Sequence, residues 1–137
     1  AIQSGAQYLV SPVYNEEILK WSLKNDILYV PGVMTVNEMF HAVQQGAQLL
    51  KFYPAVALDI NFLKLIFQPF PQFKVLATGG IDLSNIKEFF QAGVYAVGIT
   101  GKLGGASDET LDEDIAYLSK QYIEYVDKIT SQKEEIM

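Results

Sequence analysis

Short apolar runs alternate along this chain with longer segments in which apolar residues recur every three or four positions. The short runs are typical of buried strands, and proline or glycine follows most of them. They occupy residues 7–12, 27–30, 49–53, 73–77 and 95–99. The periodic segments predict helices that begin near Asn15, Thr35, Asp59 or Asn61, and Ser84, with a last helix over 110–128. Strict alternation of strand and helix predicts an α/β fold with a parallel sheet covered by helices.

Capping residues support these helix positions. Asn15 is a suitable N-cap, and Thr35 with Glu38 forms the T-x-x-E pattern of a capping box. Ser84 is the expected cap of the fourth helix, and Gly93 the residue that ends it. Five strands do not close an eight-stranded barrel, so the sheet is either open and doubly wound or part of a barrel.

Length and composition indicate one domain over residues 1–130, followed by a charged tail over 131–137. Half of the residues are apolar and 19% are charged, which is typical of a globular domain. A net charge of −6 without a basic stripe argues against nucleic acid or an anionic membrane as a partner. No apolar stretch is long enough to span a bilayer and no secretory signal is visible, so a cytoplasmic location is expected.

Lys51 is the residue that most suggests chemistry, because it lies inside the apolar run over 49–53. Burying an ammonium group is costly unless it is paired or loses its proton. Desolvation can lower the pKa of a lysine amine to about 7–8, and such an amine can form a Schiff base with a carbonyl. The alternative is a structural lysine that extends to solvent or pairs with a buried carboxylate.

Two glycine-containing turns follow neighbouring strands, Thr78-Gly79-Gly80 and Gly98-Ile99-Thr100-Gly101. Successive backbone N–H groups in such turns can bind an anion, and in TIM barrels the last two strand ends frequently bind phosphate. Alternatively, the glycines only permit tight turns. The single histidine, His41, is expected on a helix surface without a catalytic role, and no cysteine or metal-ligand cluster suggests a metal site.

Five motifs occur in an order that resembles the KDPG/KHG aldolase family, and the resemblance covers about residues 1–103. The motifs are Val10-Ser11-Pro12, Val30-Pro31-Gly32-Val33-Met34-Thr35, Leu50-Lys51-Phe52-Tyr53-Pro54-Ala55, Ala77-Thr78-Gly79-Gly80-Ile81 and Ala96-Val97-Gly98. The resemblance implies a (β/α)8 TIM-barrel fold of which this chain holds about strands 4–8. It also implies a class I aldolase that cleaves 2-keto-3-deoxy-6-phosphogluconate to pyruvate and glyceraldehyde 3-phosphate, with 4-hydroxy-2-oxoglutarate as a further substrate.

The resemblance assigns roles to individual residues. Lys51 is the implied Schiff-base lysine, so a covalent imine through Lys51 is expected, with no cofactor and no metal. Substrate-binding roles fall on Pro12, Tyr53 and Thr78, and phosphate-binding roles on Gly79, Gly80, Gly98 and Thr100. A homotrimer acting on a small keto acid is the implied assembly.

The family's first three strands, with its acid/base glutamate and carboxylate-binding arginine, have no counterpart in this sequence. The resemblance therefore implies a fragment or a truncated copy with open sheet edges, an aggregation hazard. One alternative is a non-catalytic partial barrel that binds phosphate or is only structural. Another is a phosphosugar isomerase or epimerase on the same scaffold.

Overall fold

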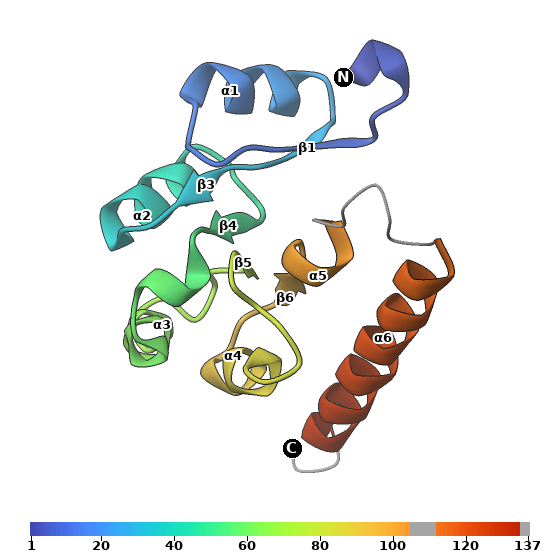
Figure 1. Cartoon of the computed structure of the whole chain (residues 1–137). Coiled ribbons are helices and arrows are strands. Elements are labelled where there is room, and N and C mark those ends of the chain that lie inside the picture. Colours follow the sequence, from blue (N-terminus) through green and yellow to red (C-terminus); the bar gives the residue numbers. More distant parts are fainter. Residues whose placement is uncertain (105–111, 135–137) are drawn as a thin grey trace.

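The computed structural model describes residues 1–104 and 112–134 and shows an α/β fold (Figure 1). Its strands are β1 (Tyr8–Val10), β2 (Leu28–Val30), β3 (Gly32–Val33), β4 (Leu50–Phe52), β5 (Val75–Thr78) and β6 (Ala96–Gly98). Its helices are α1 (Glu16–Lys24), α2 (Val36–Gln44), α3 (Ile60–Phe67), α4 (Ile86–Ala92), α5 (Gly101–Gly104) and α6 (Asp112–Glu134). Short 3-10 turns lie at Ile2–Ser4 (η1) and Ala55–Ala57 (η2).

Every recorded strand pair is parallel, as the alternation of strand and helix predicts. The predicted second strand ends before Pro31 as expected, but pairing resumes at Gly32, so that β2 pairs with β1 while β3 pairs with β4. Proline has no N–H group and cannot donate to a neighbouring strand, which explains the interruption. The carbonyl of Pro31 still accepts from the Lys51 N–H at 2.8 Å. With β2 and β3 counted as one interrupted strand, the described residues form a row of five parallel strands.

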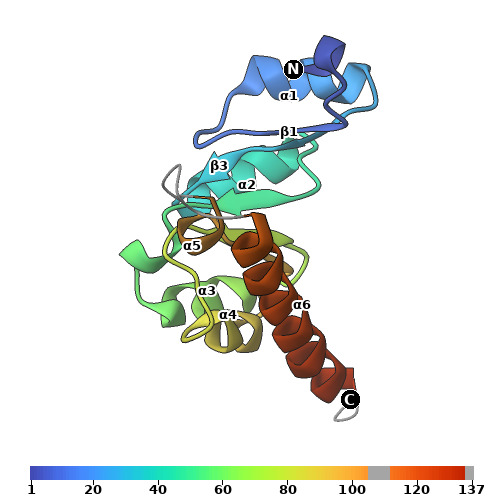
Figure 2. The ribbon, with the colours of Figure 1, turned by 45° about the vertical axis from the view of Figure 1, so that its right-hand side comes forward.

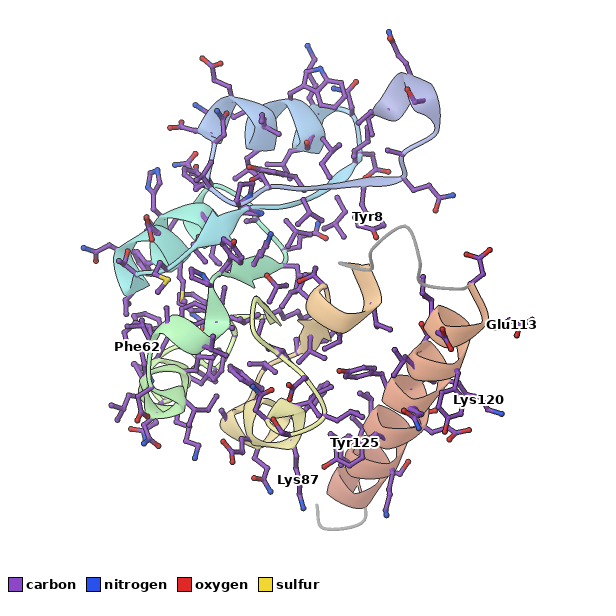
Figure 3. All side chains as sticks on the ribbon, in the orientation of Figure 1. Tyr8, Phe62, Lys87, Glu113, Lys120 and Tyr125 are labelled. Atoms are coloured by element: carbon purple, nitrogen blue, oxygen red, sulfur yellow. The ribbon has the colours of Figure 1, made fainter. Side chains whose placement is uncertain are left out.

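The two faces of this row differ in exposure. Helices α1 to α4 follow the outer side of the curved row, from blue to yellow in Figure 1. Leu50, Phe52, Val75 and Ala77 face these helices and are buried. The inner face is open: Tyr8 is 60% exposed and lies on the side of β1 away from α1 (Figure 3).

Helix α6 covers the end of the row beside α4, as Figures 1 and 2 both show. Tyr125 lies on the side of α6 toward α4, whereas Lys120 points away (Figure 3). The helix continues to Glu134, beyond its expected end near residue 128. Residues 131–134 of the expected charged tail therefore belong to this helix, whereas residues 135–137 and the expected helix start at 110–111 lie outside the described residues.

The predicted caps are confirmed except for one. The Asn15 side chain accepts from the Ile18 N–H at 2.9 Å, and Thr35 forms the expected capping box with Glu38. Ser84 does not cap α4; its N–H donates to Asp82 Oδ1 at 2.8 Å, and α4 begins after Asn85. An aspartate two residues before Ser84 forms an Asx turn that delays the helix.

Glu38 links the stability of this capping box to pH. Backbone N–H donation from Met34 at 2.9 Å, opposed in part by burial and aided by the Thr35 N–H, holds the pKa of Glu38 below its usual value. A lowered folded-state pKa contributes stability above the unfolded pKa that is lost as pH falls through the folded value. We expect Glu38→Ala to lower the free energy of unfolding at pH 7 by about 0.3–1.5 kcal/mol.

Urea unfolding at pH 7 and at pH 3 measures this effect. The difference between Glu38→Ala and the unsubstituted chain should shrink at pH 3, because the folded state loses the advantage it takes from the charged carboxylate as pH falls through the lowered pKa of Glu38. Glu88→Ala is the control, since Glu88 lies in the first turn of α4, which has no side-chain cap. An equal loss of stability at both pH values for Glu38→Ala would contradict the role of the charge.

Candidate active site

Lys51 occupies the centre of β4, between the buried residues Leu50 and Phe52. Since successive side chains of a strand point to opposite faces, Lys51 faces the open inner side while its neighbours face the helices. It is half-buried there, not fully enclosed. The register places it between Gly32 of β3 and Leu76 of β5.

The amine of Lys51 lies against an aromatic ring. Its Nζ is 4.6 Å from the centroid of the Tyr53 ring, two residues further along the same face. Within residues 1–104 and 112–134, the recorded ion pairs join Lys20 to Glu16 and Lys120 to Glu124. No described carboxylate pairs with Lys51, so the salt-bridged alternative finds no support in this part of the chain.

Thr78 lies at the carboxyl end of β5, on the inner face that also carries Lys51, and its hydroxyl group has no partner among the described residues. It is 7% exposed, and its Oγ1 is buried without a hydrogen-bond partner among the described residues. Buried hydroxyl groups without partners are uncommon and costly in folded proteins. A ligand oxygen placed beside Thr78 would satisfy this hydroxyl.

The glycines near Thr78 allow a positive φ angle at two positions and a close approach of two strands at a third. Gly79 and Gly80 have φ values of 90° and 78°, which glycine adopts without strain. Gly98 pairs with Thr78 across the sheet, and a Cβ on Gly98 would lie 2.7 Å from Thr78 Cγ2. The two predicted turns therefore do meet at one edge, as parallel strands require.

Of the remaining predicted residues, the structure brings Pro12 close to the neighbour of Lys51. Pro12 is exposed, and its carbonyl oxygen would lie 2.1 Å from a Cβ on Gly32, the residue beside Lys51. Thr100 is exposed after β6, where the next residue begins α5. His41 is exposed on α2 with its ring 5.5 Å from that of Tyr14, in agreement with the surface position expected for it.

Sequence reasoning missed three residues close to the site: Ser11, Tyr29 and Gly32. Tyr29 is 3% exposed, and its Oη lies 2.6 Å from Ser11 Oγ and 3.2 Å from the Val13 carbonyl oxygen. The available signal was a tyrosine inside an otherwise aliphatic strand, since a buried tyrosine hydroxyl usually requires a partner.

Among the described residues, no three histidine, aspartate or glutamate side chains group closely enough to hold a metal ion. No described helix combines the length and apolar character needed to cross a membrane.

A parallel strand row with outer helices, and polar groups at the carboxyl ends of its strands, defines a TIM-barrel type α/β protein represented by part of the barrel. Residues 1–120 match the family model described as KDPG and KHG aldolase. The chain belongs to this family.

Individual relatives agree with the family model. The chain is 30% identical over 125 residues to the 2-dehydro-3-deoxy-6-phosphogalactonate aldolase of Escherichia coli, covering 89% of this chain and 61% of that protein. A structure described as native KDPGal superposes with a TM-score of 0.86 at 23% identity, over 94% of this chain and 62% of the other, and supports the fold alone.

A third relative carries chemical information. The KDPG aldolase of Legionella pneumophila, solved with pyruvate captured as a covalent carbinolamine intermediate, is 29% identical with a TM-score of 0.70, covering 93% of this chain and 58% of the other. This chain thus spans about three fifths of the length of each of these three relatives.

Proposed function

We propose that this chain is the Schiff-base half of a class I aldolase, in which Lys51 forms an imine with a pyruvate-type 2-keto acid. The observation that carries the proposal is the Lys51 amine on the open face of β4, outside the recorded ion pairs and over the Tyr53 ring. The covalent pyruvate intermediate of the Legionella pneumophila relative supports the same chemistry.

The reaction begins when the unprotonated amine of Lys51 attacks the ketone carbon of the substrate. The resulting carbinolamine loses water to give an imine, and protonation of the imine nitrogen makes it an electron sink. When a base removes the proton of the C4 hydroxyl, electrons from the breaking C3–C4 bond of 2-keto-3-deoxy-6-phosphogluconate enter this sink, and glyceraldehyde 3-phosphate leaves. Protonation of the remaining enamine and hydrolysis of the imine release pyruvate and restore the amine.

The other predicted residues surround the substrate in this proposal. Pro12 and Tyr53 line the position of the keto acid beside Lys51. Thr78 donates to an oxygen at the far end of the substrate, and backbone N–H groups near that end bind its phosphate or, for 4-hydroxy-2-oxoglutarate, its carboxylate. The phosphate-binding positions are Gly79, Gly80, Gly98 and Thr100.

Proton transfer requires a further group. The family resemblance places the acid/base glutamate on barrel strands that this sequence does not match, and no described carboxylate pairs with Lys51. The 137-residue chain alone is therefore proposed to form the imine without full turnover. Complete cleavage would require three more barrel strands, and the assembled enzyme is proposed to be a cytoplasmic homotrimer.

Reduction with borohydride in the presence of pyruvate tests the imine. Intact-mass measurement should show one reduced pyruvyl group on each chain, because borohydride converts an imine to a stable secondary amine. A chain that remains unlabelled at saturating pyruvate would remove the Schiff-base role.

A non-catalytic phosphate-binding partial barrel is the second candidate, and the unpartnered hydroxyl of Thr78 favours it independently of Lys51. Thr78→Val keeps the side-chain shape but removes this hydroxyl. We expect phosphate binding, measured by calorimetric titration, to weaken by about tenfold to a hundredfold, since hydrogen bonds to charged groups contribute about 1.5–3 kcal/mol. Pyruvate trapping by borohydride should persist.

Thr130→Val on α6 is the matched control, because the Thr130 hydroxyl already donates to the Val126 carbonyl oxygen at 2.9 Å. Phosphate affinity that is unchanged in Thr78→Val would show that this hydroxyl does not face the ligand. Phosphate binding together with a complete absence of pyruvate labelling would favour the non-catalytic candidate.

A further inference from the structure

The loop that follows β1 is hydrogen-bonded to Tyr29, a buried residue of the neighbouring strand β2. Tyr29 Oη lies 2.6 Å from Ser11 Oγ and 3.2 Å from the Val13 carbonyl oxygen. Ser11 Oγ also donates to the Val13 carbonyl. The three groups form one hydrogen-bonded cluster: the Ser11 hydroxyl donates to the Val13 carbonyl, and the single proton of the Tyr29 hydroxyl is donated either to Ser11 Oγ or to the same carbonyl.

This cluster fixes the backbone on both sides of Pro12, because Ser11 and Val13 are its two neighbours in the chain. Pro12 in turn lies directly against Gly32, where a Cβ would meet the Pro12 carbonyl oxygen at 2.1 Å. Gly32 is the register partner of Lys51. A chain of contacts therefore connects Tyr29, through the loop that contains Pro12, with Gly32, the neighbour of Lys51.

We propose that Tyr29 is a positioning residue: its hydroxyl fixes the Pro12 loop over Gly32 and so forms one wall of the keto-acid position at Lys51. This inference rests on the proposed function. Tyr29 does not touch the substrate; it acts through Ser11 and Val13.

Packing alone does not account for the hydroxyl. The ring of Tyr29 belongs to the hydrophobic core, and phenylalanine would fill the same space. Burying a hydroxyl in such surroundings is unfavourable unless it is hydrogen-bonded, and the recorded partners of this one all lie in the loop. Val13 is 63% exposed, so the loop has little apolar burial of its own to hold it in place.

Tyr14 offers a matched control in the same loop. Its hydroxyl is also buried, but it has no hydrogen-bond partner among the described residues. Burial and the neighbouring Glu16 raise the pKa of Tyr14. Removal of this hydroxyl in Tyr14→Phe breaks no recorded hydrogen bond, whereas Tyr29→Phe removes the hydroxyl that bonds to Ser11 or Val13.

The experiment compares Tyr29→Phe, Ser11→Ala and Tyr14→Phe in two measurements. The first is amide hydrogen exchange at Ser11, whose N–H donates to the Val30 carbonyl at 3.2 Å. The second is the pyruvate concentration that gives half-maximal borohydride trapping. For Tyr29→Phe we expect about fivefold faster exchange at Ser11 and about fivefold more pyruvate at half-saturation, with unchanged maximal labelling. Ser11→Ala should behave in the same way, and Tyr14→Phe should match the unsubstituted chain.

Each outcome decides whether the Tyr29 hydroxyl positions the Pro12 loop or only contributes to the stability of the core. Exchange and half-saturation in Tyr29→Phe equal to those in Tyr14→Phe would overturn the inference. Faster exchange at all core amides alike, with no selective effect at Ser11, would show that the hydroxyl serves global stability and would also overturn it. If the unsubstituted chain forms no imine, the proposed function fails, while exchange at Ser11 still decides whether Tyr29 holds the loop.

Discussion

Replacing Lys51 by methionine is expected to abolish borohydride trapping of pyruvate, reducing the labelled fraction to background. Methionine keeps an unbranched, flexible side chain but has no amine that can attack the ketone. The fold should persist, because Lys51 is half-buried on the open face and pairs with no described carboxylate. Intact-mass measurement after reduction gives the labelled fraction, and circular dichroism checks the fold.

Lys74→Met is the matched control for this experiment. Lys74 directly precedes β5, and its Nζ lies 5.4 Å from the centroid of the Tyr95 ring, so it too is a lysine near a tyrosine. It is exposed at the opposite, amino end of its strand. Labelling should survive in Lys74→Met. Undiminished labelling in Lys51→Met would show that another amine reacts.

Replacing Gly32 by alanine is expected to destabilise the fold strongly, because the added methyl group has no room beside the Pro12 loop. The added Cβ would lie 2.1 Å from the Pro12 carbonyl oxygen and 2.6 Å from the Val13 nitrogen. Both are backbone atoms of a loop held by Tyr29, so neither can rotate away. We expect the free energy of unfolding to fall by about 1–3 kcal/mol, as in other overpacked sites.

Urea unfolding measures this loss, and Gly101→Ala provides the comparison. A Cβ on Gly101 would meet nothing within 4 Å, so its replacement should be nearly neutral. Pyruvate trapping should also weaken in Gly32→Ala, because displacement of the Pro12 loop disturbs the neighbourhood of Lys51. Equal stability of the two variants would contradict the close approach of the loop to Gly32.

The features that the sequence predicted correctly are those encoded over a few neighbouring residues. Apolar runs bounded by proline or glycine located the strands, and Asn15 and Thr35 marked two helix starts through contacts three residues away. Lys51 lies in a strand between Leu50 and Phe52 as predicted, while its chemical role stays a prediction. Parallel order followed from the alternation of strand and helix.

The features that were missed depend on residues distant in sequence or on competing local bonds. The contact between Tyr29 and Ser11 joins positions 18 residues apart, and no local pattern indicates it. Pro31 was expected to end a strand, but the chain resumes pairing with a different neighbour at Gly32. The start of α4 moved because Asp82 binds the backbone of Ser84 before the helix can begin there.

Peptide mapping of the borohydride-reduced pyruvate adduct in the unsubstituted chain tests the central claim most directly. Proteolysis followed by tandem mass spectrometry should place a single reduced pyruvyl group on Lys51, within the segment Leu50-Lys51-Phe52-Tyr53. Label on Lys74 or another exposed lysine with Lys51 unmodified, or no label at all, would contradict the assignment of Lys51 as the Schiff-base residue.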